Sequence, residues 1–178
     1  LNEHFLKACF LKLNKKAVSG VDGVTYQMYK ENLHDNIHAL TERLKARSYR
    51  AKLVKRQYIP KAGGKQRPLG LPALEDKLVQ LAVSTILSTI YEQDFSSSSC
   101  GYRPNVGART GVKQLLTQLR RQGFSYVVEA DIKGFFNNID HNWLLRMLEQ
   151  RVDDFAMLGL IRKWLKAGVL EEGKVFIP

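Results

Sequence analysis

The stretch from Tyr126 to His141 is the part of this sequence that most restricts how the chain can fold. Its first five residues, 126–130, are rich in β-branched and aromatic side chains and predict a short buried strand. The strand leads directly into the carboxylate of Asp131, and open α/β sheets present their chemistry at the carboxyl ends of strands. Two aromatic residues, Phe135 and Phe136, follow a glycine turn and would form a pocket floor. Because aspartates at strand ends often only cap a turn or a helix, Asp131 needs support from other motifs.

The composition favours a folded protein with a polyanionic partner. The chain has 178 residues, of which 44% are hydrophobic, so it can bury a core as one domain or as two small ones. Its formal net charge of +11 favours a phosphate-rich partner, because each phosphate neutralised by Lys or Arg releases counterions. No apolar run approaches the roughly 20 residues that cross a bilayer, and no leader is recognisable, so we expect a cytoplasmic protein without a membrane partner. Cys9 and Cys100 lack metal-binding spacing and are expected to be reduced.

Apolar residues at helical spacing predict six helices that supply most of the core. They cover residues 1–16, 25–47, 73–91, 107–122, 142–152 and 155–166. The serine-rich loop at 94–100 is too short to link independent domains. Residues 169–178 begin a strand or hairpin, and we expect its partner to lie outside this sequence.

A basic window at 45–74 holds nine of the chain's 28 Lys and Arg residues and no acidic residue. Such a run is often only a solvated face, but here apolar residues alternate with the charges as they do in a strand. The sequence Ala62-Gly63-Gly64 predicts a hairpin turn within the window. Three cations flank this turn, an arrangement suited to binding a phosphate chain: Lys61, Lys65 and Arg67.

Together these motifs resemble the reverse transcriptase domain of group II intron-encoded maturases, and the resemblance covers nearly the whole chain. Several motifs carry it in order along the sequence: Val21-Asp22-Gly23-Val24, the fingers segment Tyr58 to Pro72, Asp76-Lys77-Leu78-Val79-Gln80, Gly101-Tyr102-Arg103-Pro104, and the palm motif Asp131 to His141. Their agreement is far more specific than any one of them alone.

The resemblance implies an α+β fold, namely the fingers and a partial palm of a right-hand polymerase, rich in helix, with a basic β-hairpin and a palm strand. Residues 1–125 would be the N-terminal extension and fingers, and 126–178 the first part of the palm. In this family two Mg²⁺ ions activate the primer hydroxyl and stabilise the leaving pyrophosphate. Asp131 matches the catalytic, metal-binding carboxylate, and the carbonyl of Ile132 matches the backbone ligand beside it.

Two further motifs of the family, Tyr-Ala-Asp-Asp and Pro-Gln-Gly, are absent from this chain. We therefore expect a part of a larger protein that does not polymerise by itself.

The resemblance also assigns nucleotide-binding residues. Lys61 and Arg67 match the fingers residues that hold the incoming triphosphate. Phe136 matches the aromatic residue that excludes a ribose 2′-hydroxyl and so selects deoxynucleotides, although Phe135 and Phe136 could equally be core residues. Asn137 stands where the family commonly has Asp, at a position that is not a metal ligand.

Three functional interpretations remain open at the level of sequence. The first is an RNA-directed DNA polymerase that binds an RNA template, a DNA primer and dNTPs. The second is an RNA-binding maturase, a splicing cofactor whose polymerase role is secondary. The third is a fragment that folds on its own and associates as a homodimer through surfaces that absent parts would cover. The residues expected to bind RNA are Lys52, Lys55, Arg56, Lys65 and Arg103, although Arg103 could instead brace its own turn.

Overall fold

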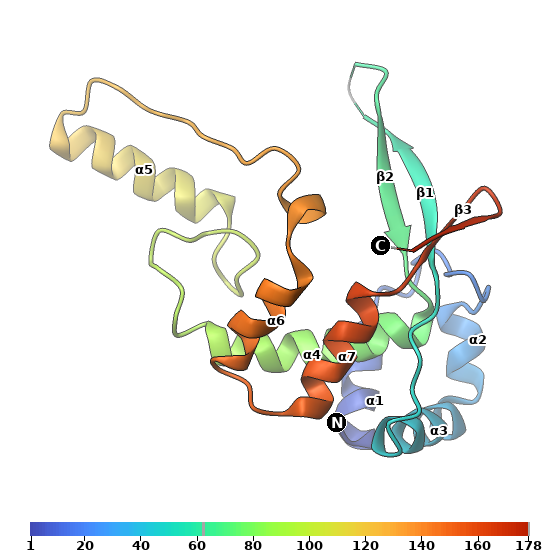
Figure 1. The fold of residues 1–178 in the computed structure, drawn as a ribbon. Coiled ribbons are helices and arrows are strands. Elements are labelled where there is room, and N and C mark those ends of the chain that lie inside the picture. Colours follow the sequence, from blue (N-terminus) through green and yellow to red (C-terminus); the bar gives the residue numbers. More distant parts are fainter. Residues whose placement is uncertain (62, 178) are drawn as a thin grey trace. The chain divides into compact units, whose positions relative to one another are not determined.

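A computed structural model describes residues 1–61 and 63–177 (Figure 1). Its helices are α1 (Glu3–Lys12), α2 (Tyr26–Glu31), α3 (Leu33–Lys45), α4 (Leu74–Tyr91), α5 (Ala108–Gln122), the 3₁₀ helix η1 (Phe135–Asn138), α6 (His141–Glu149) and α7 (Phe155–Leu165). Its strands are β1 (Val54–Pro60), β2 (Gln66–Leu71), β3 (Val169–Glu171) and β4 (Lys174–Phe176).

The predicted α+β class is confirmed. The predicted helix at 25–47 is divided at Asn32 into α2 and α3, and within the described residues no helix is both long and apolar enough to cross a bilayer.

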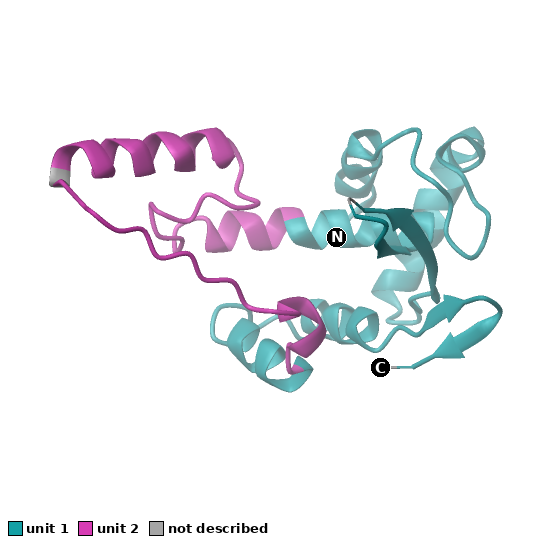
Figure 2. Ribbon diagram, turned by 90° about the horizontal axis from the view of Figure 1, so that it is seen from above, with its two compact units in different colours: residues 1–84, 141–178 teal, residues 85–140 magenta. Residues whose placement is uncertain are grey.

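The chain packs into two compact units (Figure 2). Unit 1 comprises residues 1–84 and 141–178, and unit 2 comprises residues 85–140. This division reflects how densely residues pack within each unit. The boundary predicted at residue 125 is of another kind, because it separates the expected fingers from the expected palm, and it stays a prediction.

The core of unit 1 forms where the N-terminal helices meet the first half of α4. Leu6, Cys9 and Phe10 of α1 are buried there, and the ring of Phe10 stacks on Tyr26 with centroids 4.4 Å apart. Ile37 of α3 and Leu78 of α4 are also buried. Helix α1 begins where the Asn2 side chain accepts a hydrogen bond from a backbone N–H, as N-caps do.

The described residues form one four-stranded sheet, in the order β2-β1-β3-β4, and it belongs to unit 1. The predicted hairpin is present as the antiparallel pair β1 and β2; Gly63 and Gly64 of its turn have φ of 81° and 73°, and Ala62 lies outside the described residues. The expectation that the strand after residue 169 lacks a partner is wrong. Strand β3 pairs antiparallel with β4 and parallel with β1, and the Val54 N–H donates to the Gly168 carbonyl at 2.8 Å.

The buried strand predicted at 126–130 is not formed in unit 2. These residues have no strand assignment, and the side chains of Tyr126 and Val128 are 89% and 92% exposed. A strand requires a neighbour that satisfies its backbone N–H and C=O groups, and no strand of the described residues pairs with this segment. The remaining regular structure of unit 2 is the second half of α4, then α5, which ends at Gly123 with φ of 61°, and η1.

Candidate nucleotide- and RNA-binding surfaces

The hairpin register places the predicted phosphate-binding cations on one face. Ile59 lies opposite Arg67, and Lys55 lies opposite Leu71; residues opposite each other in an antiparallel pair share a face. Just beyond the strand ends, the Lys61 N–H donates to the Lys65 carbonyl at 2.7 Å, so Lys61 and Lys65 also lie opposite each other in the same register. Four exposed cations therefore share this surface, which we call the basic face: Lys55, Lys61, Lys65 and Arg67.

The opposite face of the hairpin has different electrostatics. Tyr58 donates a hydrogen bond from its hydroxyl to the Glu171 carboxylate of β3, and this bond raises the pKa of Tyr58. The Arg56 Nε atom lies 3.9 Å from the same carboxylate. The charge of Arg56 is thus matched within the sheet, although Arg56 follows Lys55 directly in the sequence.

Lys52 lies at the base of the hairpin and is tied to two segments of unit 1. Its Nζ atom is 2.9 Å from Asp22 Oδ2, and its backbone N–H donates to Asp76 Oδ2 at 3.1 Å. The Lys52 side chain is 44% exposed, so a partner could still reach it. Its predicted contact with RNA stays a prediction, and the structure shows an internal partner that the sequence did not indicate.

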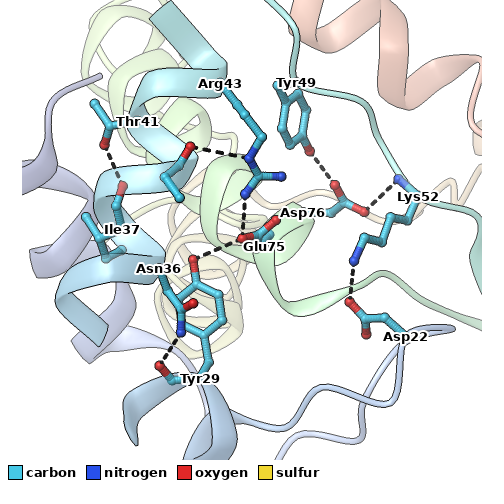
Figure 3. Close-up of polar contacts among 11 residues, drawn as sticks. Asp22, Tyr29, Asn36, Ile37, Thr41, Arg43, Tyr49, Lys52, Glu75 and Asp76 are labelled. Carbon is cyan, nitrogen blue, oxygen red and sulfur yellow. Dashed lines mark hydrogen bonds and ion pairs between the residues drawn. The ribbon is translucent and has the colours of Figure 1, made fainter. Parts of the chain in front are cut away.

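Asp76 is the centre of a buried polar network that the sequence analysis missed (Figure 3). The residue is 3% exposed, and its carboxylate accepts hydrogen bonds from the Tyr49 hydroxyl and from the Lys52 N–H. Burial raises the pKa of Asp76, while these two hydrogen bonds act in the opposite direction. The sequence did contain one indication that Asp76 is buried. Asp76 lies on the same side of α4 as the apolar residues Val79 and Val83, three and seven residues later.

Neighbouring contacts connect this network to three more helices. Glu75 accepts hydrogen bonds from the Tyr29 hydroxyl of α2 at 3.2 Å and from Arg43 of α3 at 2.8 Å (Figure 3). From α7, the Trp164 Nε1–H donates to the Tyr49 hydroxyl at 3.0 Å. The base of the basic hairpin is therefore bonded to α4 through Asp76, and α4 is bonded in turn to α2 and α3 through Glu75. Helix α7 joins the same network through Tyr49.

In unit 2, Arg103 uses its guanidinium inside its own loop. It donates from Nε and Nη2 to Glu92 Oε1 at 3.2 and 2.8 Å, and from Nη1 to the carbonyls of Ser96 and Ser99 at 2.9 Å each. The guanidinium also lies 5.3 Å from the centroid of the Phe95 ring. This geometry supports the bracing role, and the expected contact of Arg103 with RNA stays a prediction.

The predicted catalytic segment also lies in unit 2 and is open to solvent. Asp131 is exposed, and the Ile132 side chain is 68% exposed. The rings of Phe135 and Phe136 meet edge to face with centroids 5.3 Å apart, and Phe136 is the more exposed at 77% against 49%.

A carboxylate and a backbone carbonyl are the oxygen ligands that Mg²⁺ prefers, so Asp131 and Ile132 fit part of a magnesium site. Within residues 1–61 and 63–177 no group of three His, Cys, Asp or Glu side chains is placed to hold a metal ion. If Asp131 is a ligand of a two-metal site, the other carboxylates of that site would have to come from outside this chain.

Comparison with known proteins gives consistent matches. A sequence model of the family described as Reverse transcriptase (RNA-dependent DNA polymerase) matches residues 59–176. The chain is 32% identical to Protein YkfC of Escherichia coli (strain K12), over 96% of this chain and 46% of that protein. It is 41% identical to the group II intron-encoded protein LtrA of Lactococcus lactis subsp. cremoris, over 77% of this chain and 23% of LtrA. Over 53% of this chain and 13% of the relative, it is 27% identical to Nuclear intron maturase 1, mitochondrial, of Arabidopsis thaliana. The chain thus spans less than half the length of these relatives.

Proposed function

Because this chain belongs to the reverse transcriptase family and is of the group II intron-encoded type, we propose that the complete protein is an RNA-directed DNA polymerase. The observation that carries the proposal is the extent of the family match, which includes the tip and second strand of the basic hairpin as well as Asp131. The chain contributes the fingers and the first palm segment. An RNA template, a DNA primer and dNTPs are the proposed ligands.

The basic face of the hairpin is the proposed site for the triphosphate and the neighbouring nucleic acid backbone. Lys61 and Arg67 lie on the same face near the turn, so both can reach one phosphate chain. An Arg guanidinium binds phosphate oxygens in a fork, and a Lys ammonium adds a compact charge. The bonds that fix the hairpin base leave the tip as the part that can close on a nucleotide.

Asp131 and the Ile132 carbonyl are the proposed ligands of the catalytic magnesium in the complete protein. When bound, Mg²⁺ would lower the pKa of the primer hydroxyl and neutralise charge on the leaving pyrophosphate. The exposed carboxylate of Asp131 is free to take this role, because it does not cap a helix in the structure.

Phe136 is the proposed residue that distinguishes dNTPs from NTPs. A bulky ring beside the sugar excludes the 2′-hydroxyl by volume alone. The greater exposure of Phe136 and the edge-to-face support from Phe135 favour Phe136 as the residue that meets the sugar.

Primer extension on an RNA template by the complete protein tests this function. We expect Mg²⁺-dependent extension with dNTPs and none with NTPs. Asp131→Asn should abolish extension and leave RNA binding intact, whereas Glu129→Gln, which changes an exposed carboxylate two residues earlier, should preserve extension. Loss of RNA binding together with extension in Asp131→Asn would show that Asp131 is structural.

A second candidate function is that of a maturase, an RNA-binding splicing cofactor. It is favoured by the similarity to a relative named as an intron maturase and by the net charge of +11. Lys55 and Arg56 provide a matched test, because they are adjacent in sequence but lie on opposite faces of the hairpin. We expect Lys55→Ala to lower the salt slope of intron RNA binding by about one, and Arg56→Ala to lower it less because Glu171 already partners Arg56. If wild type and both variants show the same salt slope of RNA binding, the basic face does not contact RNA.

A further inference from the structure

Tyr102 in unit 2 has an unusual backbone and no visible structural role for its ring. Its φ is 57°, in the left-handed region where a bulky residue is an outlier, and its side chain is fully exposed at 103%. Asn105 nearby also has a positive φ, 61°, but its turn explains it. In Arg103-Pro104-Asn105-Val106 the second residue is Pro and the third is Asn, as a type II turn prefers, and the Val106 N–H donates to the Arg103 carbonyl at 3.4 Å. Tyr102 lies outside that turn.

The loop around Tyr102 is held by several hydrogen bonds that fix its backbone conformation. The next residue, Arg103, is fixed by its bonds to Glu92 and to two loop carbonyls. The loop is also joined to the first turns of α5, because the Gln114 side chain donates to the Ser97 carbonyl at 3.3 Å. Tyr102 is therefore presented to solvent from a defined position rather than from a mobile tip.

A glycine at this position would adopt the same φ without strain. A tyrosine keeps both an unfavourable backbone conformation and an apolar ring in water, and strained residues of this kind gather at ligand-binding sites. The observation therefore points to a ligand for the ring.

The charge of the surrounding segment indicates which ligand. Residues 95–128 contain five basic residues and no acidic residue. Arg103 is used internally, but Arg109, Lys113 and Arg120 are exposed, and their spacing of four and seven residues aligns them along one side of α5. Such a positive surface attracts a phosphate backbone, and an exposed aromatic ring stacks on any unpaired base.

We propose that Tyr102 is a stacking platform for an unpaired nucleobase of single-stranded nucleic acid. The inference rests on the proposed function, because it adds a second contact for the RNA that the family match implies. The ring supplies an apolar face, and the cations of α5, in the same unit, attract the phosphate backbone without reading its sequence.

Binding of single-stranded RNA labelled with 2-aminopurine, whose fluorescence falls when the base stacks, tests this proposal on the full chain. We expect wild type to quench the probe. Tyr102→Gly should weaken affinity at least about fivefold and abolish the quench, at an unchanged salt slope, because no phosphate contact is lost. Tyr102→Trp should retain both affinity and quench. Phe155→Ala is the matched control, because Phe155 is an aromatic residue that is 82% exposed in unit 1, and it should behave as wild type.

Thermal unfolding separates stacking from a structural role. Because glycine accepts the positive φ, we expect Tyr102→Gly to keep or raise the melting temperature. A lowered melting temperature in both Tyr102→Gly and Tyr102→Trp would show that the ring packs within the protein and would overturn the proposal. Wild-type affinity and quench in Tyr102→Gly would also overturn it while leaving the proposed function intact. Failure of the wild-type chain to bind the RNA would overturn the stacking proposal, whereas primer extension by the complete protein tests the proposed function separately.

Discussion

Replacement of Asp76 by Ala is expected to be among the most destabilising single substitutions in unit 1. The carboxylate is buried and accepts bonds from the Tyr49 hydroxyl and the Lys52 N–H, so its removal leaves one buried and one part-buried donor without this partner. An orphaned donor costs about 1–3 kcal/mol when it is buried and less when water can reach it, which gives a loss of about 2–4 kcal/mol in the free energy of unfolding. Asp76→Asn can accept only one of the two bonds with its single carbonyl oxygen, so we expect a loss of about 1–3 kcal/mol.

The pH dependence gives the same residue a second test. Burial raises the pKa of Asp76 above its ordinary value of 3.8, so the folded protein binds this proton more tightly than the unfolded chain does. The resulting stabilisation is fully present below pH 3.8 and is lost as the pH rises through the raised pKa. Because Asn does not titrate there, the stability difference between wild type and Asp76→Asn should be largest at low pH and should narrow as the pH rises.

Urea unfolding followed by far-UV circular dichroism, at pH values from about 3.5 to 8, measures both effects. Asp35→Ala is a suitable control, because that side chain is 86% exposed, and it should leave the unfolding midpoint unchanged. An Asp76→Ala protein as stable as wild type would refute the reasoning, since it would mean that the two donors find other partners. A stability difference between wild type and Asp76→Asn that widens with rising pH would refute the assigned direction of the pKa.

Three further changes test other parts of the fold. Gly20→Ala should lower the urea midpoint, because its Cβ would lie 2.6 Å from the Ala73 Cα and the main chain would have to move. Arg103→Lys should speed chymotrypsin cleavage of the loop in unit 2, because Lys cannot replace the forked bonds to Glu92 and two carbonyls. The amides of 126–130, which pair with no strand of the described residues, should exchange hydrogen rapidly in this chain and more slowly in the complete protein.

Local sequence patterns were sufficient for the elements but not for their long-range partners. The glycine pair between alternating residues predicted the hairpin. The acidic pair Asp153-Asp154 precedes α7 and offers two candidate N-caps, and in the structure the Asp154 side chain accepts bonds from two backbone N–H groups. The parallel pairing of β1 with β3 could not be predicted, because it joins residues far apart in the chain and leaves no local signature.

The burial of Asp76 was missed for a related reason. An acidic residue in the first turn of a helix interacts favourably with the helix dipole, which was a sufficient local explanation for Asp76. That explanation gave no reason to expect its tertiary hydrogen bonds. Its donors, Tyr49 and Lys52, come from the segment before β1, which no periodicity links to α4. The candidate residues could be chosen by their motifs, but the sequence could not show that Glu171 of β3 partners Arg56 and leaves Lys55 on the exposed basic face.

The hairpin and the segment at 126–130 show why similar strand propensity gives different outcomes. Apolar residues alternate with charged residues in β1, and apolar and β-branched residues cluster in 126–130. Only β1 is followed by a turn that brings β2 back beside it, and β3 pairs with its other edge. Residues 126–130 follow the helix stop at Gly123 and lead to the turn at Gly134, so no adjacent hairpin supplies a partner. A strand that depends on distant neighbours positions its carboxylate only when those neighbours are present. The proposed catalytic residue Asp131 therefore depends on the rest of the palm for its geometry as well as for its companion ligands, whereas the basic face of the hairpin is complete within this chain.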